Sequence, residues 1–416
     1  MLLKETKIFI ILFAIFPVVD ALNGFVLSAG INLPIGVAYR LVCVGFLVFQ
    51  IARKGFSKTI YTFLSVALIF CGIISLFIQT IVLQNDATAL LYDATNMIKF
   101  FLWVLIPYYV YQRVDLFTKT GYAKLFLAIS TFFTLGLLIP YVLGIGNQTY
   151  AGSDAGYKAF FFANNDTTIG FIVSATFTGW YLFQQTKQTK IWTRLLLGLL
   201  YLGNLLGLLL LGTKTGIVYG VILTIVLLLR FFFFQKRVGP AAKWGIGVTV
   251  ISVLTLIVVQ GRAFVVTTLS GLIQRLTYFY NLYDGDLVRF ITSSRSEFLD
   301  AAFGHFINTS NLLTQLIGFG FNERVTTWGL GDLVEMDFFD VFFSLGMLGL
   351  VVMLGLLLFF LIKSCQKRSI YTALFLILLC YGAFAGHVLF SALSSTLFGL
   401  VCGGLFLQKE SLCEKE

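Results

Sequence analysis

The sequence predicts an all-α polytopic membrane protein with about 12 transmembrane helices. Of its 416 residues, 58% are hydrophobic and only 12% are charged, which is more apolar surface than a soluble domain of this length buries. Apolar runs of roughly 18–22 residues recur along the chain with charged breaks between them. The cations are also distributed unevenly among the breaks, as integral membrane proteins require.

The apolar runs define the expected spans. The first run follows Lys4 and Lys7 and contains Asp20 and Asn23, without a clean small-residue cleavage site, so we interpret it as a retained helix. The expected spans are at about 8–29, 33–51, 60–83, 97–111, 123–145, 166–183, 195–211, 216–234, 245–260, 337–362, 370–386 and 389–407.

The net charge of +10 follows from membrane topology and does not indicate a nucleic-acid partner. With the N-terminus inside, the cytoplasmic segments hold 20 of the 29 Lys and Arg residues. This positive-inside bias places both termini in the cytoplasm. None of the six cysteines is placed to form a disulfide on the outer side. His305 and His387 are far apart in sequence, so we expect packed or solvated side chains and no metal site.

The chain divides into helices 1–9 (residues 1–260), one large extracytoplasmic loop (261–336), and helices 10–12 with a short cytoplasmic tail (337–416). Within the loop, FVVTTLSGLIQRLTYFYNLY has the spacing of an amphipathic helix lying on the outer membrane surface. SSRSEFLDAAFGHFIN predicts a second helix, with Ser293 or Ser294 as its N-cap.

The large loop concentrates arginine. All five of its cations are Arg, although Lys is common elsewhere in the chain, and an Arg fork matches phosphate oxygens. Arg262 and Arg275 have the alternative of pairing with nearby acids, whereas Arg295, between two serines, is the stronger functional candidate. Arg289 and Arg324 are supporting candidates.

Acidic residues gather where the loop returns to the membrane, at Asp332, Glu335, Asp337 and Asp340. One interpretation is that they cap the N-terminus of the next span, where the helix dipole favours negative charge. The other is that one of them takes a proton during catalysis. The sequence leaves both open for each acid.

Other polar groups are predicted at the outer face. Lys214 lies in the tight turn LGTKTG, whose open backbone suits an anion. Arg40 and Lys99 lie within spans, where they either bind an anion or pair with Asp20 or Asp93. A further set binds sugar hydroxyls or caps a helix: Asn164, Asn165 and Asp166.

In this order, these motifs resemble the superfamily of O-antigen ligases and Wzy-type polysaccharide polymerases. The resemblance runs from about 150 to 350: the stretch GYKAFFFANND, the LGTKTG turn, an SSR element that opens a helix, a GxG at Gly318–Gly320, and an acid before a GMLG turn. Lys214 falls where the family has an Arg, Arg295 matches its loop Arg, and Glu335 falls where the ligases have a His. The acid favours a capsule, exopolysaccharide or O-antigen polymerase.

The resemblance implies a GT-C-like fold and a glycosyltransferase of the bacterial plasma membrane that faces outward. Its donor would be an oligosaccharide on undecaprenyl diphosphate, and it would need no metal or other cofactor. Glu335 would be the base, Lys214 and Arg295 would stabilise the leaving diphosphate, and Asp337 would hold a sugar hydroxyl. A flippase and a chain-length regulator are candidate partners. The alternatives are a ligase and, in another class, a flippase for the same lipid.

Overall fold

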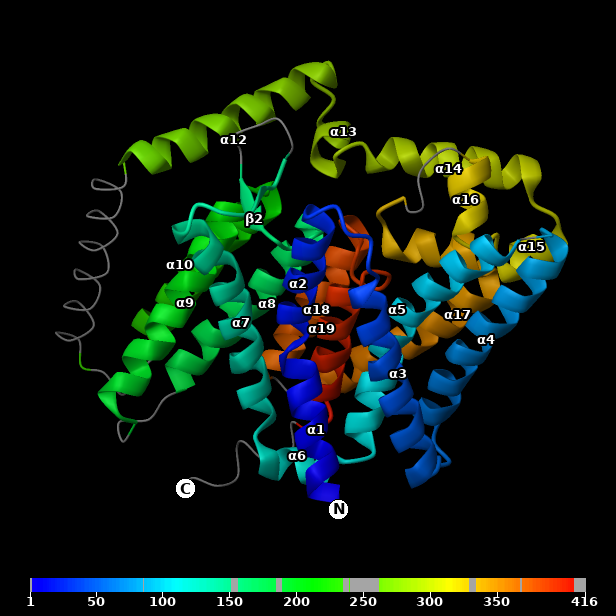
Figure 1. Ribbon diagram of the computed structural model, residues 1–416, viewed down its shortest axis with the longest axis horizontal. Coiled ribbons are helices and arrows are strands. Elements are labelled where there is room, and N and C mark those ends of the chain that lie inside the picture. The colour runs from blue at the N-terminus through cyan, green and yellow to red at the C-terminus, as the bar shows by residue number, and fades with distance from the viewer. Residues whose placement is uncertain are drawn as a thin grey trace. The chain divides into compact units, whose positions relative to one another are not determined.

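The computed structural model describes residues 2–84, 86–150, 156–184, 189–234, 239, 262–328, 334–366 and 369–407 (Figure 1). Helices dominate this part of the chain. The sheet within it is a small antiparallel hairpin of β1 (Asn147–Gln148) and β2 (Tyr157–Ala159), with Asn147 opposite Ala159. The expected all-α architecture is therefore confirmed for the described residues.

The chain forms two compact units, with unit 1 made of residues 1–19, 34–125 and 286–416, and unit 2 of residues 20–33 and 126–285. Unit 1 holds α1 (Leu2–Ala14), α3 (Ile35–Lys54), α4 (Ile60–Val82), α5 (Ala87–Tyr111), α6 (Val114–Thr120), α13 (Leu287–Thr292), α14 (Arg295–Thr309), α15 (Leu312–Ile317), α16 (Asn322–Thr327), α17 (Asp337–Gln366), α18 (Ile370–Phe384) and α19 (Ala392–Gly404). Unit 2 holds the hairpin, α8 (Asn164–Gln184), α9 (Ile191–Leu211), α10 (Lys214–Phe234) and α12 (Arg262–Leu282). Helices α2 (Phe16–Ser28) and α7 (Tyr122–Val142) begin in unit 1 and continue in unit 2.

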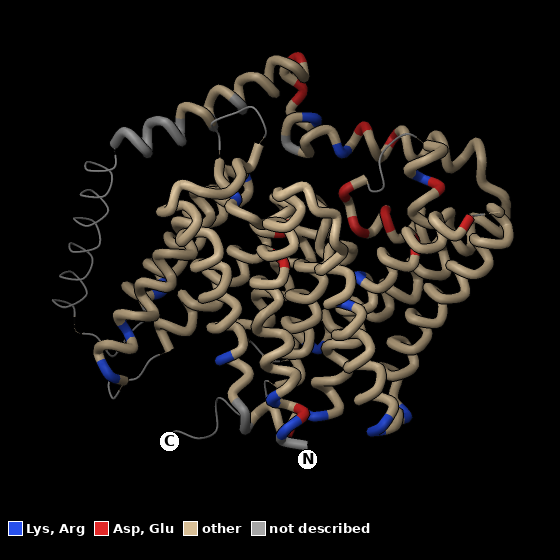
Figure 2. The backbone as a smooth tube through the Cα atoms, viewed as in Figure 1, with Lys and Arg blue, Asp and Glu red and all other residues tan. Residues whose placement is uncertain are grey.

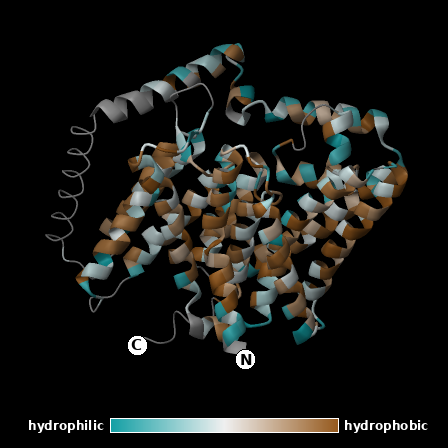
Figure 3. Ribbon diagram, in the orientation of Figure 1, coloured by the Kyte–Doolittle hydropathy of each residue, from teal (hydrophilic) through white to brown (hydrophobic). Residues whose placement is uncertain are grey.

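Eight helices in the described part of the chain are long and apolar enough to cross a membrane: 4–28 (α1 and α2 together), α3, α4, α5, α7, α9, α10 and α17. Their surfaces carry many large apolar side chains, whose exposure to water would be unfavourable. Phe63 is 70% exposed and Ile81 is 76% exposed, both on α4. The hydropathy colouring of Figure 3 shows α4 largely brown along its length. Such faces suit lipid contact.

Four of the expected twelve spans are not among these eight. The one at 245–260 lies outside the described residues. The one at 166–183 is helical in α8, but its many Thr, Ser and Gly residues lower its hydropathy, and residues 166–179 are buried on all sides within unit 2. The last two are helical in α18 and α19, which are only 15 and 13 residues long.

The loop between α18 and α19 explains their shortness. Gly386 and His387 both have φ 62°, a left-handed conformation that no helix continues through. Gly386 is required there, because a Cβ would lie 2.4 Å from the backbone carbonyl of Glu335. The loop is therefore folded against the residues that precede α17.

Helix α17 is broken at Gly346, which has φ 68° and ψ −170°. The GxG stretch packs against the break, since Phe319 N donates to Phe343 O at 2.9 Å and Gly320 N to Ser344 O at 3.1 Å. Gln79 Nε2 of α4 donates to both Ile317 O (2.7 Å) and Ser344 O (2.8 Å). Backbone groups freed by the break are thus paired inside unit 1, as a membrane environment requires.

The segment expected to be a large loop is mostly helical. Helices α12 and α14 confirm the two helices that the sequence predicts within it. An apolar cluster holds α14 against α17 and consists of Ala302, Phe306, Phe319, Trp328, Val334 and Phe343. Figure 2 shows acidic residues along α14 and at the start of α17, whereas Lys and Arg gather near the start of α1 and between α3 and α4. The two ends of unit 1 therefore differ in charge.

Candidate active site

The acidic stretch before α17 is shaped by Asp340. This carboxylate is fully buried and accepts hydrogen bonds from Val334 N (2.7 Å, Oδ1) and Met336 N (3.1 Å, Oδ2). The residue between them, Glu335, has φ 65°, a conformation that non-glycine residues adopt only when the surroundings impose it. Asp340 therefore folds the turn that presents the Glu335 side chain.

Asp340 is itself paired with Arg324 of α16. The guanidinium NH2 lies 2.7 Å from Asp340 Oδ1, NH1 donates to Ser344 Oγ at 2.9 Å, and each charged side chain is 1% exposed. A guanidinium buried in this way is engaged in packing α16 on α17. This geometry favours a structural part for Arg324, and the diphosphate contact that the sequence suggests stays a prediction.

Asp337 is buried as well. It is 1% exposed, and its Oδ2 accepts hydrogen bonds from Val388 N (2.9 Å) and Leu389 N (3.2 Å). The carboxylate thereby fixes the α18–α19 loop on the start of α17. Burial leaves it no room for the sugar hydroxyl that the sequence predicts, so its position favours a structural part. Asp332 lies outside the described residues.

Glu335 is the acid that stays accessible, with 37% of its side chain exposed. Its Oε2 lies 2.5 Å from NH2 of Arg295, which is 12% exposed. Its Oε1 lies 3.2 Å from Nε2 of His387, which is 22% exposed. Residues from α14, from the turn before α17 and from the α18–α19 loop thus meet at one carboxylate.

The electrostatics of Glu335 balance burial against its two partners. Burial raises the pKa of the carboxyl, but the neighbouring imidazole of His387, together with the charge and hydrogen bond of Arg295, outweighs this. The net result is a pKa below the ordinary value of 4.5. Glu335 is therefore ionised at neutral pH.

Arg295 is held at the start of α14 by local backbone geometry. Ser293 and Ser294 both have left-handed φ values, 55° and 65°, and Arg295 NH1 donates to Thr292 O at 3.2 Å. Ser294 occupies the expected N-cap position, but its side chain makes no capping bond. The Nε–H of Arg295 is buried without a hydrogen-bond partner among the described residues, which leaves a donor for an incoming oxyanion.

The second loop arginine that the sequence favours lies on α13. Arg289 NH2 is 2.6 Å from Glu297 Oε1, with 37% and 43% of the two side chains exposed. An exposed pair of this kind contributes little to stability and opens readily. Arg289 therefore stays a candidate for substrate contact.

Unit 2 contains the other candidates that the sequence assigns to the outer face. The turn at Thr213 is bonded to the first turn of α8, because Thr213 and Thr168 share a hydroxyl hydrogen bond of 3.0 Å. Lys214 follows that turn as the first residue of α10 and is partly buried. Asn164 begins α8 and donates to Thr149 O at 2.8 Å, and Asn165 beside it is also partly buried. The fold thus brings Lys214 and the two asparagines to neighbouring helix starts.

These observations match a family found by sequence comparison. Residues 4–289 and 279–411 match the profile of a family described as O-antigen ligase like membrane protein. The chain belongs to this family. The match covers nearly the whole chain and so confirms the resemblance that the motifs from 150 to 350 suggest. No curated protein matches the chain in sequence.

Membership of the O-antigen ligase-like family makes the chain a membrane enzyme of the glycosyl-transfer type, acting as a polymerase or a ligase. It also directs attention to the face that carries Arg295 and Glu335. Among the described residues, no group of three His, Cys, Asp or Glu side chains could hold a metal ion.

Two of the predicted cations lie within the spans of unit 1. Arg40 of α3 is 2% exposed and donates from NH1 to Gly36 O at 3.2 Å. Lys99 of α5 donates to Asn96 Oδ1 at 3.0 Å. Asp93, one of the two partners that the sequence suggests for them, accepts from Phe321 N (2.9 Å) and Asn322 N (2.7 Å). Asp93 thus supports the α16 segment.

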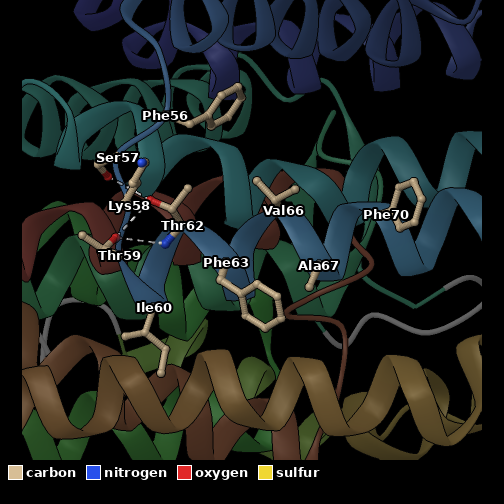
Figure 4. A pocket seen from close by; sticks show the side chains of 10 residues that line it. All are labelled: Phe56, Ser57, Lys58, Thr59, Ile60, Thr62, Phe63, Val66, Ala67 and Phe70. Carbon is tan, nitrogen blue, oxygen red and sulfur yellow. Dashed lines mark hydrogen bonds between the residues drawn. The ribbon is translucent and has the colours of Figure 1, made fainter.

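A large apolar groove lies at the opposite end of α4 from Gln79 (Figure 4). Its volume is about 780 Å³, and it is lined by Phe56, Ser57, Lys58, Thr59, Ile60, Thr62, Phe63, Val66, Ala67 and Phe70. It holds no carboxylate that could act as a base. The groove therefore suits a hydrocarbon chain.

Sequence reasoning missed the contact of His387 with Glu335. Fifty-two positions (387 − 335) separate His387 from Glu335, and this spacing carries no periodic signal, so the sequence suggests only a packed or solvated side chain. The available signal was its place at the outer end of a span, close to a glycine. The structure adds the partner that the sequence could not name, because the α18–α19 loop folds back onto Glu335.

Proposed function

We propose that this protein polymerises oligosaccharide units carried on undecaprenyl diphosphate, at the outer leaflet of the bacterial plasma membrane. The observation that carries the proposal is the accessible carboxylate of Glu335 beside the guanidinium of Arg295, at the start of a membrane span. Glycosyl transfer from a lipid diphosphate needs both groups: a base for the acceptor and a cation for the leaving group. The charge difference between the ends of unit 1 supports an outward-facing site.

The proposed reaction is a single displacement. An acceptor hydroxyl attacks the anomeric carbon of the donor sugar, and a new glycosidic bond forms as the bond to the diphosphate oxygen breaks. The leaving lipid diphosphate takes the bonding electron pair, and Glu335 takes the hydroxyl proton. Arg295 stabilises the negative charge that develops on the diphosphate, and Lys214 and Arg289 are further candidates for that role.

The Arg295–Glu335 pair represents a resting arrangement. While the two side chains neutralise each other, neither is free for chemistry. An incoming diphosphate offers Arg295 more negative charge than one carboxylate does, so the guanidinium exchanges partners. When the guanidinium of Arg295 moves to the diphosphate, the pKa of Glu335 rises, because the positive charge that stabilised the carboxylate is no longer beside it. Donor binding thus makes Glu335 a stronger base.

The choice of polymerase rests on an acid at the position where the ligases of this family have a His. A specific observation also supports the ligase as a second candidate. His387 brings an imidazole to 3.2 Å from Glu335, so a His is present at the site although it comes from another loop. In either case a flippase would supply the donor lipid, and a chain-length regulator would act on the polymerase.

The lipid-linked glycans of cells that lack the gene separate these functions. We expect single repeat units to accumulate on undecaprenyl diphosphate at the outer leaflet. Long chains retained on the lipid would show a ligase. Single units confined to the inner leaflet would show a flippase and would overturn a catalytic role for Glu335.

A further inference from the structure

We propose that His387, in the loop between α18 and α19, is a positioning residue that holds Glu335 as the base once the donor has drawn Arg295 away. This inference rests on the proposed function. It adds a residue from a third segment of the chain to a site otherwise formed by α14 and the turn before α17.

The geometry gives each oxygen of Glu335 its own partner. Arg295 lies at Oε2 and His387 at Oε1, so departure of the arginine exposes one oxygen while the other stays held. A base fixed at one oxygen points the other at the acceptor hydroxyl. Positioning of this kind is valuable, because a displacement of about 1 Å at a reacting group costs about 100-fold in rate.

The loop is built to keep the imidazole at that place. Gly386 packs so closely on the Glu335 carbonyl that a Cβ would lie 2.4 Å from it. On the other side of His387, the N–H groups of Val388 and Leu389 are bonded to the buried Asp337. The backbone is therefore anchored on both sides of the histidine and against the residues that carry Glu335.

Charged groups from every neighbouring segment act on this pair. Arg295 reaches it from α14, and Asp337 and Asp340 lie at the start of α17. Asp340 is compensated by Arg324 from α16, whereas His387 lies close enough to Asp337 to influence it electrostatically. With Arg295 on the diphosphate, His387 is the group that still favours the ionised form of Glu335.

The test uses full-length protein in nanodiscs with an undecaprenyl-diphosphate-linked repeat unit, and measures kcat and donor KM from low to neutral pH. His387→Asn tolerates the left-handed backbone but shortens the side chain, and His387→Gln keeps an uncharged donor. We expect kcat to fall about 100-fold in the Asn variant, with donor KM within about threefold. The Gln variant should recover at least tenfold of the loss.

The pH profile distinguishes positioning from a structural part. Both substitutions remove the imidazole that lowers the pKa of Glu335, so this pKa rises and the acid limb of kcat moves to higher pH. His305→Gln is the matched control, because His305 stacks on Trp328 with ring centroids 6.0 Å apart and lies away from Glu335 in the α14 helix. It should leave both kcat and the acid limb unchanged.

Each outcome decides between the two proposals. If wild-type protein elongates glycan and the folded His387 variants keep its kcat and acid limb, the positioning role is wrong while the polymerase stands. If wild-type protein does not elongate glycan, the proposed function fails and takes this inference with it. If the Asn variant does not fold, the shift in the acid limb of kcat in the Gln variant tests the positioning role by itself: an unchanged limb shows that the role is wrong.

Discussion

The buried Arg324–Asp340 pair offers a test of how the site is supported. Each side chain is 1% exposed, so removal of one leaves the other charge buried without compensation. Breaking a buried pair in this way costs about 3–5 kcal/mol. We therefore expect Arg324→Met and Asp340→Asn each to lower the free energy of unfolding by that amount. The double variant should lose less than the sum of the two, by about 2–3 kcal/mol.

Unfolding in detergent, followed by tryptophan fluorescence, measures these differences. The exposed pair provides the control: Arg289→Met should cost at most about 1 kcal/mol, since 37% and 43% of those two side chains are exposed. The folded fraction of the Arg324 variant should bind the donor normally. Wild-type stability combined with weakened donor binding would refute the structural part and return Arg324 to the diphosphate.

Further predictions concern the base, the turn and the break. The acid limb of kcat should lie at higher pH than the acid limb of kcat/KM. The profile of kcat/KM reports the free enzyme, in which Arg295 lowers the pKa of Glu335, whereas the profile of kcat reports the complex with donor; identical acid limbs would contradict the exchange of partners. Lys214→Gln should raise donor KM about tenfold and Lys214→Arg should not; equal KM values would exclude a phosphate contact. Gly346→Ala should lower the thermal midpoint, because its Cβ would lie 2.3 Å from Leu316 O; an unchanged midpoint would contradict the required close approach.

The sequence predicts the helices well because apolar runs of sufficient length leave few alternatives. The boundaries of α3, α4 and α9 fall within a few residues of the expected spans. The approach is weaker for α8, whose Thr and Ser residues reflect burial inside unit 2 rather than contact with lipid. A helix that is surrounded by protein can carry more polar residues than a helix that faces lipid. A single sequence does not show in advance which of the two surroundings a helix has.

The candidate site is predicted in part. Charge type and position are enough to select Arg295 and the acidic stretch that contains Glu335, and the fold brings these two residues together. The same pattern cannot separate Glu335 from Asp337 and Asp340. The three carboxylates differ in their bonding, because Asp337 and Asp340 accept hydrogen bonds from backbone N–H groups and Asp340 also pairs with Arg324. His387 illustrates a further limit, since its contact depends on the fold of a short loop between two helices.

The most direct test of the central claim compares wild-type protein with Glu335→Gln in nanodiscs that contain undecaprenyl-diphosphate-linked repeat units. The product is the length of the lipid-linked glycan, resolved by gel electrophoresis over time. The account predicts chains of many repeats from the wild type, and elongation slowed about 100-fold or more by the substitution, because an amide accepts no proton. Elongation by Glu335→Gln at the wild-type rate would contradict it.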